Sequence, residues 1–283
     1  MSREEFTKAN VDYYLAELAK EFKKLTHRKA EAEIILVGGA SVLINYDFRL
    51  NTTDLDAIIQ APSAMKDAIN NVSNRLGLGS DWLNDDFKKT DSYTPKLSQY
   101  AKYYRTFANV LTVRTISDEY LIAMKLRAGR QYKNDMSDVV GIISQLRSSG
   151  NDITLEKVKD AYEVLYGDWR DLPDIMKLVV ESSISETDNP HIYQSTRDRE
   201  EHTKKVMIDF ENRYPGVLNE SNEEEIVSKL MENNSSKPDI IPKNGIIHKN
   251  EKESVDVWTA IAYAKKKYSE NAKNSDTKGE TIG

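Results

Sequence analysis

A buried strand that runs into two glycines is the feature that most constrains this chain. Residues 33–37 are mostly apolar, and Gly38 and Gly39 follow them directly. Adjacent glycines after a strand let the backbone turn tightly and come close to a ligand. The apolar segment 40–46 predicts a short helix, whose first N–H groups, with the hydroxyl of Ser41, face the space above the glycines. This arrangement is typical of a phosphate-binding bend.

An acidic pair follows the bend. Asp54 and Asp56 open the apolar segment 55–59, which predicts a second strand. Side chains alternate along a strand, so residues two positions apart point the same way. Mg²⁺ prefers carboxylate oxygens together with substrate phosphates. The pattern therefore predicts a site for Mg²⁺ (or Mn²⁺) beside the glycines.

Each feature also has an ordinary structural interpretation. Two glycines after a strand are often only a turn, and Asp-x-Asp often marks a solvated strand end. Arg49, between the two motifs, fits a solvated turn as well as a contact to a triphosphate. The ordered combination of both motifs is much rarer than either alone, and it favours the functional interpretation.

The order of these motifs resembles the nucleotidyltransferase superfamily typified by DNA polymerase β. Its signature is an apolar residue, two small residues, a spacer and Asp-x-Asp, and Gly38, Gly39, Asp54 and Asp56 occupy those positions. The resemblance implies that the chain binds an NTP with Mg²⁺ and moves an NMP to an acceptor hydroxyl. No acidic residue lies within the expected strand 110–116, where the third metal ligand of the superfamily usually sits.

A later segment extends the resemblance. Residues 117–130 predict a helix that contains Lys125, and Asp135 and Asp138 open the next apolar helix. This order resembles the AbiEii-like and DUF6036-type bacterial nucleotidyltransferases, which include toxin components of toxin–antitoxin systems. The resemblance implies that Lys125 contacts nucleotide phosphates and that Asp135 or Asp138 supports the metal or acts near the attacking group. Both aspartates equally fit a helix N-terminus.

The predicted fold is α+β, with a small mixed β-sheet nucleotidyltransferase core flanked by helices and a helical C-terminal portion. Apolar residues at helical spacing predict an N-terminal helix over 4–26 that covers the sheet. The expected regions are a catalytic core with that helix over 1–150, a helical extension over 151–182, and a polar, mostly helical region over 183–283. Within the last region we expect a linker over 183–197, helices over 197–213, 222–232 and 254–268, and a free tail from 271.

Composition excludes several classes of protein. The chain has 283 residues, no cysteine and a formal net charge of −6. Disulfide and thiol chemistry are therefore absent. The sequence has no apolar run long enough for a membrane span, and its N-terminus has no apolar signal region. These features predict a cytoplasmic protein without membrane contact.

The sequence does not distinguish among several classes of acceptor. An RNA 3′ end such as that of tRNA, a protein hydroxyl and a small molecule all fit the predicted chemistry. The basic and aromatic stretch 88–105 suits contact with a base or single-stranded nucleic acid, and it equally suits a solvated surface. The C-terminal region is the expected contact for a protein partner such as an antitoxin. The alternative from another class is a catalytically inactive nucleotide-binding or interaction module of the same fold.

Overall fold

The computed structural model describes residues 5–130, 133–185, 189–218, 222, 226–227 and 229–230. The chain divides into two compact units. The first contains Met1–Ala128 and Gln145–Leu172, and the second contains Gly129–Ser144 and Pro173–Gly283. The boundaries expected from the sequence, at residues 150 and 182, remain a prediction. No helix in the described part of the chain combines the length and apolar composition needed to cross a bilayer.

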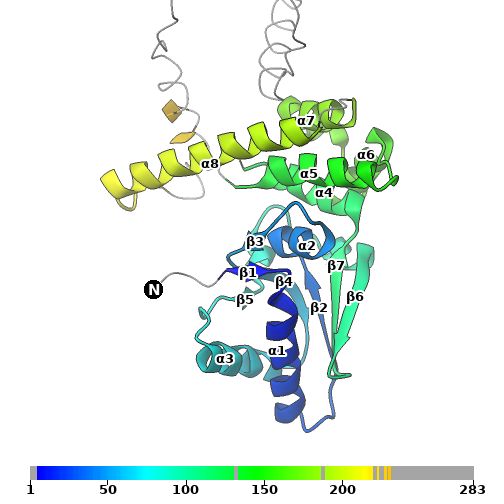
Figure 1. Ribbon diagram of the computed structural model, residues 1–283, viewed down its shortest axis with the longest axis vertical. Coiled ribbons are helices and arrows are strands. Elements are labelled where there is room, and N and C mark those ends of the chain that lie inside the picture. The colour runs from blue at the N-terminus through cyan, green and yellow to red at the C-terminus, as the bar shows by residue number, and fades with distance from the viewer. Residues whose placement is uncertain are drawn as a thin grey trace, which may run out of the picture. The chain divides into compact units, whose positions relative to one another are not determined.

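A five-stranded mixed sheet forms the centre of the first unit (Figure 1). β2 is antiparallel to β4 and parallel to β7, and β6 is antiparallel to β7 at one edge. β5 pairs in parallel with β4 at the other edge. The fold is therefore mixed α/β, as the sequence predicts. In sheet order the strands are β5 (Leu83–Asn84), β4 (Leu55–Gln60), β2 (Ala32–Leu36), β7 (Leu111–Ile116) and β6 (Ala101–Phe107).

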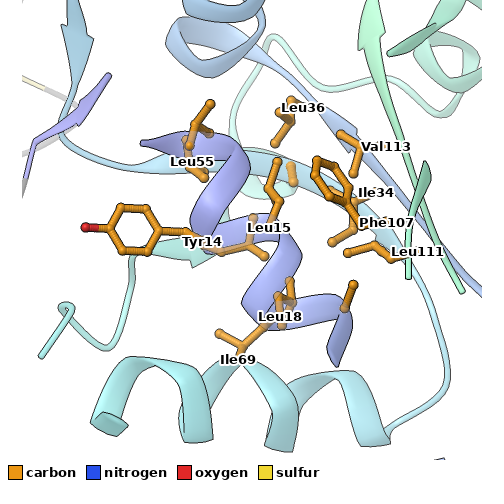
Figure 2. Packing of buried hydrophobic residues seen from close by; sticks show 14 of the residues in the cluster. Tyr14, Leu15, Leu18, Ile34, Leu36, Leu55, Ile69, Phe107, Leu111 and Val113 are labelled. Atoms are coloured by element: carbon orange, nitrogen blue, oxygen red, sulfur yellow. The ribbon is translucent and has the colours of Figure 1, made fainter. Parts of the chain in front are cut away.

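Two helices, α1 (Val11–Leu25) and α3 (Ala64–Leu76), pack on one face of this sheet. Apolar side chains recur along α1 at helical spacing, so one side of the helix is apolar and faces the core. Figure 2 shows Leu15 and Leu18 of α1 in the same buried cluster as the strand residue Ile34. All three side chains are completely buried. This core fixes the sheet on which the candidate site is built.

The N-terminal segment contains a short strand before its helix. The helix predicted over 4–26 is wrong in its first part, because β1 (Phe6–Thr7) pairs antiparallel with β3 (Asn51–Thr52). Phe6 is 1% exposed, and its ring centroid lies 5.5 Å from that of Tyr14 and 6.1 Å from that of Trp82. The aromatic cluster therefore anchors β1, and β1 in turn holds the segment that leads to Asp54.

The remaining helices differ from the prediction mainly near residue 190. The linker expected over 183–197 is wrong for its described residues, because helices run up to Ser185 and resume at Asn189. The helix expected over 222–232 falls only in part on described residues, and the helix over 254–268 and the tail lie outside them. The first unit also contains the helices α2 (Gly38–Asn45), α4 (Asp118–Ala128) and α6 (Leu155–Tyr166), with the 3₁₀ turns Asp86–Lys89, Pro95–Tyr100 and Trp169–Asp171. The second unit contains α7 (Asp174–Ser185), α8 (Asn189–Arg213) and most of α5 (Asp135–Ser148), whose last four residues are assigned to the first unit.

Candidate functional site

The glycine bend lies between β2 and α2. Val37 is still extended, with φ −123° and ψ 179°, and α2 begins at Gly38, two residues earlier than the sequence predicts. Gly38 has φ +52°, a left-handed conformation that L-residues adopt only with strain. A Cβ at Gly38 would lie 3.8 Å from Oδ2 of Asp56. The bend and the second aspartate of the acidic pair are therefore direct neighbours.

The acidic pair lies on the side of β4 that faces away from the core. Leu55 and Ala57 are completely buried in the core under α1 and α3, whereas Asp54 and Asp56 are half-buried. Alternation along the strand therefore directs the two carboxylates away from the core. The N–H of Val37 donates to the carbonyl of Asp56 at 2.9 Å, which holds the end of β2 against the start of β4. The glycine bend and the acidic pair consequently share one end of the sheet.

Arg49 lies over the bend. A Cβ at Gly39 would meet Nη2 of Arg49 at 2.7 Å and its Cζ at 3.0 Å. Atoms in folded proteins do not approach a Cβ so closely, so the guanidinium occupies space that only a glycine leaves open. Nε of Arg49 donates to the carbonyl of Asn51 at 3.2 Å, which orients the side chain. A half-buried guanidinium beside backbone N–H groups can bind a phosphate.

Thr52 also lies beside the glycine bend, and no motif in the sequence singles it out. Its Oγ1 lies 3.0 Å from the same Cβ position at Gly39, and the residue is 6% exposed. Thr52 belongs to β3, which β1 holds in place through the pairing of Phe6 with Thr52. Its only signal in the sequence is its place two residues before Asp54, which does not distinguish it from other strand threonines.

Ser41 is placed in the core. Its side chain is completely buried, and Oγ accepts a hydrogen bond from the N–H of Ile116 at 3.0 Å. Its own N–H donates to the carbonyl of Val37 at 3.1 Å. Both groups therefore connect α2 to the ends of neighbouring strands. We assign Ser41 this packing role, and the contact of its hydroxyl with a phosphate, expected from the sequence, remains a prediction.

Lys125 was the other candidate in the first unit. Lys125 is 5% exposed within α4, and its contact with phosphates remains a prediction. Asp118, at the start of α4, accepts hydrogen bonds from the hydroxyl of Tyr46 at 2.5 Å and from Nζ of Lys102 at 2.8 Å. Burial, together with the charge of Asp118, raises the pKa of Tyr46, so this hydroxyl stays a donor. Asp118 is thus engaged in a structural network.

A third carboxylate ligand is not found in the described part of the chain. No group of three or more His, Asp or Glu side chains there has an arrangement that could hold a metal ion. Mg²⁺ commonly binds through only one or two carboxylates, with water and substrate phosphates in its other positions. Asp54 and Asp56 alone therefore meet the donor requirement of a metal that arrives with a nucleotide.

Asp135 and Asp138 belong to the second unit. Both lie in the first turn of α5 and are completely buried. Asp135 accepts a hydrogen bond from Nε of Arg130 at 2.9 Å and another from the N–H of Arg130 at 3.3 Å. These contacts tie the first turn of α5 to the residues that precede it. A catalytic role for either aspartate remains a prediction.

Comparison with known proteins adds one finding. A family model described as "Nucleotidyltransferase of unknown function (DUF6036)" matches residues 13–171. This span is more than half of the 283 residues, and it includes the glycine bend, Arg49, Thr52 and the acidic pair. No curated protein and no solved structure matches the chain.

Proposed function

The chain belongs to the nucleotidyltransferase family of unknown function (DUF6036), and on this premise we propose that it transfers an NMP from an NTP to an acceptor hydroxyl in the presence of Mg²⁺. The observation that carries the proposal is the contact of the glycine bend with side chains of opposite charge. Asp56 lies beside Gly38, and Arg49 lies against Gly39. A nucleotide triphosphate with its metal needs both charges at one place, because the metal seeks carboxylates and the phosphates seek cations and N–H donors.

Asp54 and Asp56 are the residues that would hold the metal. They are half-buried at a strand end, so their oxygens are partly desolvated yet reachable by a hydrated ion. When bound, Mg²⁺ neutralises charge on the triphosphate and on the pyrophosphate that leaves. The chain itself supplies the rigid placement of the two carboxylates, through the pairing of β2 with β4.

The phosphates would lie over Gly39. Glycine lets the backbone N–H groups at the start of α2 approach phosphate oxygens, and the positive end of the helix favours the negative charge. Arg49 offers two parallel N–H donors, and the Thr52 hydroxyl offers a third. These groups position the α-phosphorus for in-line attack by the acceptor oxygen. One P–O bond forms to the acceptor, the bond to the β-phosphate breaks, and the acceptor proton passes to water.

The acceptor that we propose is an RNA 3′ end, such as that of tRNA. Tyr103 on the edge strand β6 is 65% exposed and has the cations Lys102 and Arg105 close by in sequence. Exposed rings beside cations are suited to stacking on unpaired bases. Both cations also form ion pairs, at 2.8 Å with Asp118 and at 2.6 Å with Asp12. An RNA acceptor further fits the hypothesis of a toxin-like component with an antitoxin partner.

The test is an incubation of the full chain with Mg²⁺, each labelled NTP in turn and total RNA. We expect release of pyrophosphate and label on RNA. Asp56→Asn should abolish both, whereas Asp47→Asn should not, because Asp47 is 78% exposed and pairs with Lys8 at 2.7 Å. Label on protein alone would refute the RNA acceptor and leave nucleotidyl transfer standing. Nucleotide binding without pyrophosphate release would support the inactive binding module instead.

The toxin hypothesis has a separate test. Induced expression in a bacterial host should arrest growth for the wild type, and Asp56→Asn should remove the arrest at equal protein level. Growth that is unaffected by the wild-type chain would contradict a toxin-like role, while the transfer reaction would still be decided by the labelling experiment.

A further inference from the structure

A glutamate of α8 caps the N-terminus of α5. Glu200 is 2% exposed, and its carboxyl group accepts hydrogen bonds from the N–H groups of Met136 at 2.8 Å and Ser137 at 3.2 Å. The hydroxyl of Ser137 also bonds to this carboxyl group. The first N–H groups of a helix have no partner within the helix, so an acceptor from elsewhere is needed when they are buried. Glu200 provides it and fastens α8 to α5 within the second unit (Figure 1).

Three acidic side chains are buried at the N-terminus of α5, two from its own first turn and Glu200 from α8. Asp135, Asp138 and Glu200 are all nearly or completely buried. Arg130 compensates Asp135 through an ion pair of 2.9 Å. The charge of Asp138 acts directly on Glu200. The positive end of the helix favours one negative charge here, but two ionised carboxylates in one buried turn repel each other.

A retained proton relieves this repulsion. Burial raises the pKa of Glu200 to about 8, and the charge of Asp138 acts in the same direction. The hydrogen bonds from Ser137 and Met136 act in the opposite direction. Glu200 therefore holds a proton at neutral pH, while its carboxyl oxygens still accept from the α5 N–H groups.

We propose that Glu200 is a pH-sensitive lock between α8 and α5, which is closed while the Asp138–Glu200 pair retains one proton and loosens when that proton passes to water. The lock uses neither the glycine bend nor Asp54 and Asp56, but it includes Asp138, for which a catalytic role remains a prediction.

The direction of the pH effect follows from linkage. When α8 detaches, Glu200 is in water with an ordinary pKa of about 4.3. Between that pH and about 8 the closed state binds one proton more than the open state. The closed state is therefore fully favoured at the acid end, and the opening constant rises up to about tenfold per pH unit before it levels off above the folded pKa.

Hydrogen exchange of the α5 amides measures this opening in the full chain. For a peptide that contains Met136 and Ser137, we expect the protection factor, corrected for intrinsic rates, to fall up to about tenfold per unit from about pH 6 and to level off above about pH 8. Glu200→Gln keeps an acceptor for both N–H groups and cannot ionise, so its protection should not change with pH. Glu201→Gln is the matched control, because Glu201 is half-exposed and lies 3.5 Å from Arg197, and it should follow the wild type.

A pH-independent protection factor in the wild type would overturn the proposal, as would an equal fall in Glu200→Gln. Asp138→Asn provides a second measurement should Glu200→Gln not fold. Removing the neighbouring charge lowers the pKa of Glu200, so the fall should level off at a lower pH than in the wild type. A levelling point that stays unchanged would show that the two carboxyl groups do not act as a pair.

Discussion

The guanidinium of Arg49 lies so close to Gly39 that a Cβ there would come within 2.7 Å of Nη2. The arginine is ten residues away along the chain, and the loop before β4 brings it back over the bend. A glycine at this position therefore serves contact with another side chain, whereas Gly38 serves the turn through its φ of +52°. The two adjacent glycines thus have different physical reasons to be glycine.

Gly39→Ala should lower the affinity for nucleotide while leaving the stability of the fold nearly unchanged. The added methyl group displaces the flexible end of Arg49. We therefore expect the affinity for Mg–NTP to fall about tenfold or more, because the loss of roughly one charge-assisted hydrogen bond has an effect of this size. The free energy of unfolding should change by less than about 1 kcal/mol, because the Arg49 group that must move is the end of a flexible side chain and the Thr52 hydroxyl, at 3.0 Å, has to shift only slightly. Calorimetric titration and denaturant unfolding measure the two quantities.

The matched control is Gly79→Ala. A Cβ at Gly79 would lie 2.9 Å from Oδ1 of Asp81, which is again the end of a flexible side chain, but it lies in the loop before β5. This variant should bind nucleotide as the wild type does. Equal affinities of the Gly39 and Gly79 variants would contradict a phosphate site over Gly39.

Thr52→Val should weaken nucleotide binding with little effect on folding. Valine keeps the shape of threonine and its preference for strands but lacks the hydroxyl that lies beside Gly39. The expected loss of affinity is about 0.5–1.5 kcal/mol, the net contribution of one hydrogen bond. Thr52→Ser retains the hydroxyl and should restore most of the affinity. If serine and valine bound nucleotide equally weakly, the hydroxyl would have no part in binding.

Ser41→Ala should show the opposite pattern. It leaves the buried N–H of Ile116 without its acceptor, which typically costs about 1–3 kcal/mol of unfolding free energy. The affinity of the folded protein for Mg–NTP should be unchanged. Ser63→Ala is the control, because Ser63 precedes α3, is exposed and makes no capping hydrogen bond. A loss of affinity without a loss of stability would instead make Ser41 a phosphate ligand.

Phe6→Ala should affect both properties. Removing a buried aromatic ring costs about 3–5 kcal/mol, and Phe6 also pairs with Thr52 through β1 and β3. We therefore expect a large loss of stability and, under conditions where the variant stays folded, weaker nucleotide binding. Tyr13→Ala, at a side chain that is 53% exposed, should change neither quantity appreciably. Wild-type affinity in folded Phe6→Ala would show that β1 does not position the loop.

Local patterns in the sequence predict the elements that depend on near neighbours. The strand before Gly38, the strand after Asp54 and the helix α3 each show their periodicity within a few residues. Capping is equally local: the side chain of Thr154, which precedes α6, accepts a hydrogen bond from the N–H of Lys157 at 3.3 Å. The acidic pair lies beside the bend because β2 and β4 are adjacent and antiparallel.

Elements that depend on distant partners could not be predicted in this way. β1, β3 and β5 are two residues long, too short for any alternation to be visible. In β6 a register shift between Tyr103 and Arg105 breaks the alternation, and most of the strand is exposed at the sheet edge. Residues 189–197 of α8 were predicted as a linker because this stretch is polar, and the buried Thr196 lies within it. Further along α8, the burial of Glu200 is offset by hydrogen bonds from the N–H groups of Met136 and Ser137 in α5, which are distant in the sequence.

The central claim is that a divalent ion binds at Asp54 and Asp56 beside Gly38 and Gly39. The most direct measurement is nuclear magnetic resonance of the full chain with ¹⁵N-labelled glycine, titrated with Mn²⁺, which broadens signals from nearby amides. The signals of Gly38 and Gly39 should broaden first in the wild type and stay sharp in the double variant Asp54→Asn, Asp56→Asn. If these signals stay sharp in the wild type, or broaden equally in the double variant, the metal site is not at the glycine bend.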